Sequence, residues 1–171
     1  LVICYLVLLA SLRRLSTSLL PVSLFFIGLG MLLQTTLMSN NLVGTDIHME
    51  YYYYNISKES GWNPGIPHNY NSALGLTILA PFISNLFGLD GVWIFKVIYP
   101  MVFSLTPVIL YYAYSNFLGR EEAFLSSFFF ISIPVFMLEV VSISKLQLGG
   151  FFFSLLVFLT CSKVDNKLRI A

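Results

Sequence analysis

The sequence is poor in charged residues. Nine Lys and Arg and eight Asp and Glu make up about 10% of its 171 residues, where a soluble domain carries about 25%. So few charges cannot cover a water-facing surface. A net charge of +1 without a basic stripe also excludes an electrostatic binder of nucleic acid. Because 57% of the residues are hydrophobic, the composition predicts a membrane protein.

Cysteine is scarce as well. Cys4 and Cys161 both lie in or beside apolar runs, which excludes a disulfide framework and a zinc site of clustered thiolates. The first apolar run, residues 1–10, has no basic region before it and no small-residue cleavage site after it, so it does not read as a signal peptide. We interpret it as the remnant of a truncated span, and we expect the chain to be an internal fragment of a larger membrane protein.

Several apolar runs are long enough to cross a bilayer, which takes about 20 residues of helix. Only helices satisfy the backbone within one crossing segment. We therefore predict an all-α fold, a polytopic transmembrane helical bundle in which residues 1–171 form one multi-pass segment. Beyond the remnant, the predicted spans are residues 19–38, 92–114, 123–141 and 146–160. Pro100 and Pro107 predict kinks in the second of these.

The apolar run 73–89 is short and leaves two topologies open. Basic residues favour the cytoplasmic side of a membrane. If every run crosses, that side holds Arg13, Arg14, Lys96 and Lys145. If the run 73–89 is instead an interfacial or re-entrant helix, that side holds Arg13, Arg14, Arg120, Lys163, Lys167 and Arg169. We favour the second topology, in which the whole loop 39–91 lies on the non-cytoplasmic side. A short kinked span is the alternative.

The outer loop carries an acidic pair directly after a predicted span. If a helix begins near Asp46, then Asp46 and Glu50 share one face of it, and His48 points to roughly the opposite side. A carboxylate beside the membrane surface is suited to general acid–base work. A structural interpretation is equally open, in which Asp46 caps the helix and Glu50 complements its dipole. Gly61 is expected to end this helix.

Other polar residues lie where they could reach the same site. Lys96 and Lys145 are near the outer ends of two spans, where an ionisable group is a functional candidate, and Glu139 lies one turn before Lys145. We expect these side chains to converge with the acidic pair. The candidate substrate-binding residues are His48, His68, Asn69, Lys96, Lys145 and Gln147.

Two motifs carry a resemblance to a known family. Residues 44–51 read Gly-Thr-Asp-Ile-His-Met-Glu-Tyr, and residues 91–100 read Gly-Val-Trp-Ile-Phe-Lys-Val-Ile-Tyr-Pro. An acidic residue just after a span, in the first large outer loop, resembles the GT-C membrane glycosyltransferases, which include the protein O-mannosyltransferases. Both motifs most closely resemble a group of GT-C-like archaeal multi-pass proteins. The chain departs from the O-mannosyltransferases, whose acids are adjacent, and it has no Asp near Gln147, where many relatives carry one.

The resemblance implies a function on the outer face of the membrane. A sugar would arrive on a polyprenyl phosphate. Asp46 would accept the proton of the acceptor hydroxyl or amide, or orient it for attack, and Glu50 would assist or share a divalent cation with Asp46. Lys145 or Lys96 would neutralise the departing phosphate. The implied partners are the lipid bilayer, the polyprenyl-phosphate-linked sugar and the remainder of a larger protein. The alternative is a multi-pass protein with a transport or structural role.

Overall fold

A computed structural model describes residues 16–162 of the chain. Every regular element in that range is helical, so the all-α prediction is confirmed. The predicted remnant 1–10 lies outside the described residues. The same holds for the flanking basic residues Arg13, Arg14, Lys163, Lys167 and Arg169.

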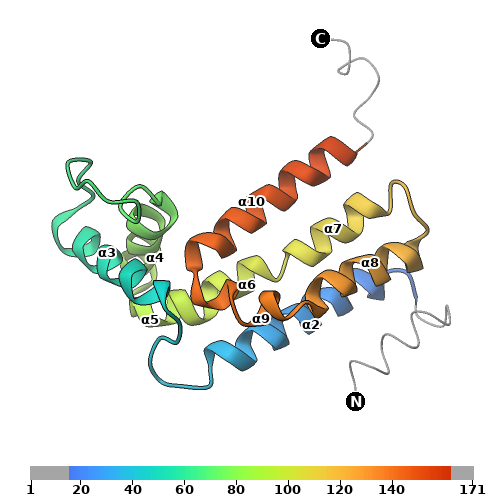
Figure 1. The fold of residues 1–171 in the computed structure, drawn as a ribbon, viewed down its shortest axis with the longest axis horizontal. Coiled ribbons are helices and arrows are strands. Elements are labelled where there is room, and N and C mark those ends of the chain that lie inside the picture. Colours follow the sequence, from blue (N-terminus) through green and yellow to red (C-terminus); the bar gives the residue numbers. More distant parts are fainter. Residues whose placement is uncertain (1–15, 163–171) are drawn as a thin grey trace, which may run out of the picture.

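Three helices are long and apolar enough to cross a membrane (Figure 1). They are α2 (Leu19–Thr36), the composite helix Gly91–Tyr114 and α10 (Ser144–Cys161). The composite helix consists of α5 (Gly91–Trp93), η2 (Ile94–Ile98), α6 (Tyr99–Phe103) and α7 (Thr106–Tyr114). Its break falls at Ser104 and Leu105, where Pro107 has no N–H to offer the carbonyl of Phe103.

A fourth candidate for a crossing, or for a re-entrant loop, is bent. Helix α8 (Arg120–Ser132) and the segment Pro134–Ser142, which holds α9 (Pro134–Met137) and η3 (Val140–Ser142), meet at an angle of 63°. Ile133 is extended there, with φ −71° and ψ 129°, because the ring of the following proline disfavours helical geometry at that position. The region predicted as the span 123–141 is therefore two helices with a sharp corner between them.

The helices share two buried cores. The first lies between α2, α7 and α8 and contains Leu24, Phe124 and Ile131 among others. The second lies beneath α3 (Asp46–Ser60), where Ile47 and Tyr54 pack with residues of η1 (Gly75–Leu79) and η2. This second core fixes α3 against the end of the bundle (Figure 1).

The segment between α2 and α5 leaves the bundle and returns to the same end of it. Helix α2 ends and α5 begins on the side where α3 and α4 (Ala80–Phe87) lie (Figure 1). The Nζ atom of Lys96 donates a hydrogen bond to the carbonyl of Ser39, which ties the two ends together. The apolar helix Gly75–Phe87 is shorter than the three candidate spans. This arrangement favours the topology in which it does not cross, which stays a prediction.

Candidate functional site

The loop before α3 places Asp46, the first residue of α3, beside the start of α10. Gly44 has φ +137°, a backbone conformation that favours glycine, and an added Cβ would lie 2.7 Å from the Cα atom of Ser142. Glycine thus lets the loop touch the segment that leads into α10. At the other end, Gly61 has φ +77° and follows the last residue of α3, as predicted.

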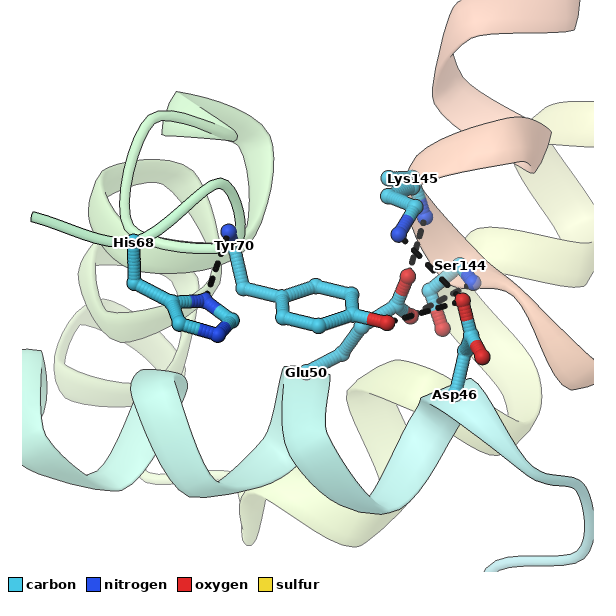
Figure 2. A network of polar contacts seen from close by, with 6 residues as sticks. All are labelled: Asp46, Glu50, His68, Tyr70, Ser144 and Lys145. Carbon is cyan, nitrogen blue, oxygen red and sulfur yellow. Dashed lines mark hydrogen bonds and ion pairs between the residues drawn. The ribbon is translucent and has the colours of Figure 1, made fainter.

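Glu50 is enclosed between α3 and the first turn of α10 (Figure 2). Its side chain is 0% exposed. One carboxylate oxygen accepts a hydrogen bond from the backbone N–H of Ser144 at 2.6 Å, and the other accepts one from Lys145 at 3.3 Å. Helix α10 begins at Ser144, so Glu50 occupies the role of an N-cap contributed by another helix. Its charge complements the dipole of α10 and not that of α3.

Burial raises the pKa of the Glu50 carboxyl, and the two backbone hydrogen bonds from α10 oppose that rise. Because the carboxyl is shielded from solvent, it is not placed to meet a substrate directly. The predicted pair therefore divides into a buried carboxyl that holds α10 and a second one that remains accessible.

Asp46 is the accessible member of the pair. Its Oδ2 atom accepts hydrogen bonds from the hydroxyl of Tyr70 at 2.9 Å and from Nζ of Lys145 at 3.3 Å (Figure 2). The side chains of Asp46 and Lys145 are 36% and 39% exposed. The Tyr70 hydrogen bond, followed by that of Lys145, holds the pKa of Asp46 below its ordinary value. Asp46 is not the N-cap residue of α3. Thr45 holds that position, and its side chain makes no cap hydrogen bond.

Two aromatic rings, those of His68 and Tyr53, support Tyr70. The rings of His68 and Tyr70 stack at 5.2 Å between centroids, and His68 stacks on Tyr53 of α3 at 4.8 Å. Nδ1 of His68 also accepts a hydrogen bond from the backbone N–H of Tyr70 at 3.3 Å. Nζ of Lys145 lies 3.8 Å from the centroid of the Tyr70 ring, a cation–π contact. Tyr70 therefore contacts both an imidazole and an ammonium group.

The remaining candidates lie apart from this cluster. Lys96 is 4% exposed and turned toward the carbonyl of Ser39. Gln147 is 0% exposed, and its Nε2 atom donates to the carbonyl of Val140 at 3.1 Å. His48 and Asn69 are exposed, without a polar contact to the acidic pair in the described part of the chain. Glu139 is likewise exposed and outside the cluster.

Two members of the cluster were not predicted. Tyr70 lies 24 residues after Asp46, in a loop where proline and asparagine give no helical periodicity, so no spacing could pair them. Ser144 contributes only a backbone N–H, which has no sequence signature. The sequence signal that could have indicated Tyr70 was its position next to His68 and Asn69, both of which were candidate substrate-binding residues.

Within residues 16–162, no group of three or more His, Cys, Asp or Glu side chains is arranged to hold a metal ion. The two carboxylates face different donors, Glu50 the backbone of α10 and Asp46 the side chains of Tyr70 and Lys145. The arrangement suits proton acceptance by Asp46 and anion neutralisation by Lys145.

Comparison with protein-family models, with curated proteins and with solved structures finds no match to this chain.

Proposed function

We propose that this chain is part of a membrane glycosyltransferase, which transfers a sugar from a polyprenyl-phosphate donor to an acceptor on the non-cytoplasmic face of the membrane. The observation that carries the proposal is the accessible pair of Asp46 and Lys145, 3.3 Å apart at the end of the helical bundle. A base and a fixed cation side by side are what transfer from a phosphate leaving group requires. The motif resemblance to GT-C enzymes points in the same direction.

In the proposed reaction the hydroxyl or amide of the acceptor attacks the anomeric carbon, and the bond from that carbon to the phosphate oxygen breaks. The proton of the acceptor passes to Asp46, and the bonding electrons leave with the lipid phosphate. Lys145 neutralises the charge that develops on the phosphate oxygen. Asp46 thus accepts the proton and Lys145 stabilises the leaving group, and these two side chains already contact each other.

The resting ion pair has a chemical consequence for this reaction. While Tyr70 and Lys145 both donate to Asp46, its pKa is lowered and it is a weak base. A donor phosphate that draws Lys145 away would remove one of these donors and raise the basicity of Asp46. The base would therefore become effective when the donor is bound, which limits unproductive hydrolysis.

An apolar groove beside Lys145 supports a lipid-linked donor. The groove has a volume of about 450 Å³ and begins at Leu146, the residue after Lys145. It continues along α10 past Gly150 and Phe153 to Val157, a length of about 16 Å at ~1.5 Å per helical residue. A polyprenyl chain in this groove would hold its phosphate at the start of α10, where Lys145 lies.

The proposal also fixes the side of the membrane. Nucleotide sugars are absent from the non-cytoplasmic face, so a donor used there must be lipid-linked. We propose that the loop 39–91 lies on this face of the cell membrane and that the helix Gly75–Phe87 lies in the interface. A cysteine introduced at Asp90 should react with a membrane-impermeant label added from outside, and reaction only after permeabilisation would overturn this placement.

Replacement of Asp46 by Asn in the full-length protein tests the proposed role. The variant keeps the size and a hydrogen-bond acceptor, so we expect normal membrane insertion and a loss of sugar transfer. Glu59→Gln is the matched control, because Glu59 is an exposed acid on the same helix. Transfer at the wild-type rate in Asp46→Asn would refute the assignment.

A further inference from the structure

A second cavity lies at the opposite end of the bundle from Asp46. It has a volume of about 460 Å³ and lies between the start of α2, the end of α7 and the start of α8. Ser115 and Arg120, which flank the turn between α7 and α8, belong to its lining, and Figure 1 shows this turn beside the start of α2. This cavity plays no part in the proposed transfer reaction, and the inference drawn from it is independent of that function.

Five hydroxyl-bearing residues, one proline and one cation line the cavity. The contributing residues are Thr17, Ser18, Pro21, Tyr111, Tyr112, Ser115 and Arg120. One guanidinium nitrogen of Arg120 donates a hydrogen bond to Oγ1 of Thr17 at 3.0 Å, which orients the group at the cavity wall. A guanidinium group has five N–H donors in a planar fork, so this bond leaves most of them for a ligand.

Such a set of donors matches a phosphate group. Arginine binds phosphate oxygens in bidentate fashion, and hydroxyl groups complete the remaining acceptor sites. The neighbouring acids Glu121 and Glu122 do not line the cavity. Among the described residues that line the cavity, Arg120 is the one cation.

The depth of the cavity indicates where the phosphate comes from. It lies where α2 begins, where the composite helix ends at Tyr114 and where α8 begins. The ends of membrane-spanning helices lie at the depth of lipid headgroups. Arg13 and Arg14 precede Thr17 by only four and three residues in the sequence, and basic residues next to a span attract anionic lipids.

We propose that this cavity binds the phosphate group of an anionic phospholipid from the leaflet opposite the Asp46 site. Arg120 holds the phosphate through paired N–H groups, and the hydroxyls of Thr17 and Ser18 complete its coordination. The bound lipid joins the start of α2 to the turn between α7 and α8, two parts of the chain that are far apart in sequence.

The experiment measures thermal unfolding of the purified full chain in neutral detergent. Phosphatidylglycerol, phosphatidylcholine and inorganic phosphate are titrated separately into the wild type, Arg120→Gln and the double variant Thr17→Ala with Ser18→Ala. Lys58→Gln is the control, because Lys58 is an exposed cation on α3 at the far end of the bundle. Arg120 is exposed, so its replacement leaves the core intact.

We expect phosphatidylglycerol to stabilise the wild type and Lys58→Gln with similar affinity, and to bind Arg120→Gln about tenfold more weakly, since hydrogen bonds to charged groups have that order of effect. Protection by inorganic phosphate, lost in Arg120→Gln, would support the phosphate pocket and identify a free phosphate as its ligand. Equal affinity for phosphatidylglycerol in all four proteins would overturn the proposal, and so would equal protection by phosphatidylcholine in all four.

Discussion

The carboxylate of Glu50 in α3 accepts hydrogen bonds from the backbone N–H groups of Ser144 and Lys145, at the start of a helix 94 residues later in the chain. This contact fixes the first turn of α10 against the outer loop. Lys145 then extends its side chain to Asp46, one turn before Glu50. The buried acid thus positions the exposed pair, and several consequences of this arrangement can be measured.

Replacement of Glu50 by Ala should lower the stability of the protein by about 1–3 kcal/mol, because two buried N–H groups would lose their acceptor. Glu50→Gln retains one carbonyl oxygen as an acceptor, so a smaller loss of about 1 kcal/mol is expected. Unfolding of the purified protein in detergent measures both values, with Glu59→Ala as the exposed control. If Glu50→Ala is as stable as the wild type, the capping role is wrong.

Glu50 should also give the stability a distinctive dependence on pH. Burial raises its folded-state pKa above the ordinary value of 4.5, so between these two values the folded protein binds more protons than the unfolded chain. The free energy of unfolding contributed by this group therefore falls as pH rises through that window. The contribution of Asp46 has the opposite sign, because its pKa is lowered and its stabilisation is lost on acidification.

The difference in unfolding free energy between the wild type and Glu50→Gln isolates the Glu50 contribution, since Asp46 is common to both proteins. This difference should change in favour of Glu50→Gln as pH rises above 4.5. A difference that is flat with pH would show that Glu50 titrates normally.

Tyr70→Phe removes the largest cause of the low pKa of Asp46 while it preserves the stacked rings. The pKa of Asp46 should therefore rise, and the acid limb of any Asp46-dependent activity should move to higher pH. Carboxyl NMR titration measures the pKa directly. Tyr52→Phe alters an exposed tyrosine of α3, the helix of Asp46, and should leave the pKa of Asp46 unchanged. An unshifted pKa of Asp46 in Tyr70→Phe would contradict the observed hydrogen bond.

Lys96 and Lys145 should respond differently to replacement by Met. Lys96 is buried against the carbonyl of Ser39, so Lys96→Met should cost about 1–3 kcal/mol of stability and leave sugar transfer intact. Lys145→Met should weaken transfer while it changes stability by less than about 1 kcal/mol, as expected for an exposed ion pair. The reverse pattern would restore Lys96 as the residue that contacts the donor.

Adjacent glycines in α10 provide a matched test of its packing. A Cβ atom on Gly150 would lie 2.8 Å from the ring of Phe103, whereas one on Gly149 would meet no atom within 4 Å. Gly150→Ala should therefore destabilise the protein by about 1–3 kcal/mol through overpacking. Gly149→Ala should be neutral or slightly stabilising, because alanine favours helix. If the two replacements change stability equally, α10 is rotated about its axis relative to its orientation in the structure.

The local parts of the site could be predicted from the sequence because their physical causes are local. Residues four apart share a helix face, which brought Asp46 and Glu50 to one side of α3, and a glycine without a Cβ penalty ended that helix at Gly61. The spacing could not tell that Glu50 would be buried and Asp46 exposed. That difference depends on α10, which packs over one of the two side chains.

Composition and hydropathy by themselves determined that the chain is helical and suited to a membrane, because long apolar runs with few charges can satisfy their backbone only within helices. Only the tertiary structure decided which polar residues meet. Lys145 joined the acidic pair while Lys96 and Gln147, equally plausible by position, were turned into the interior. The reason is physical: contacts between residues about 100 apart depend on the rotation and tilt of packed helices, which the sequence pattern of one helix does not specify.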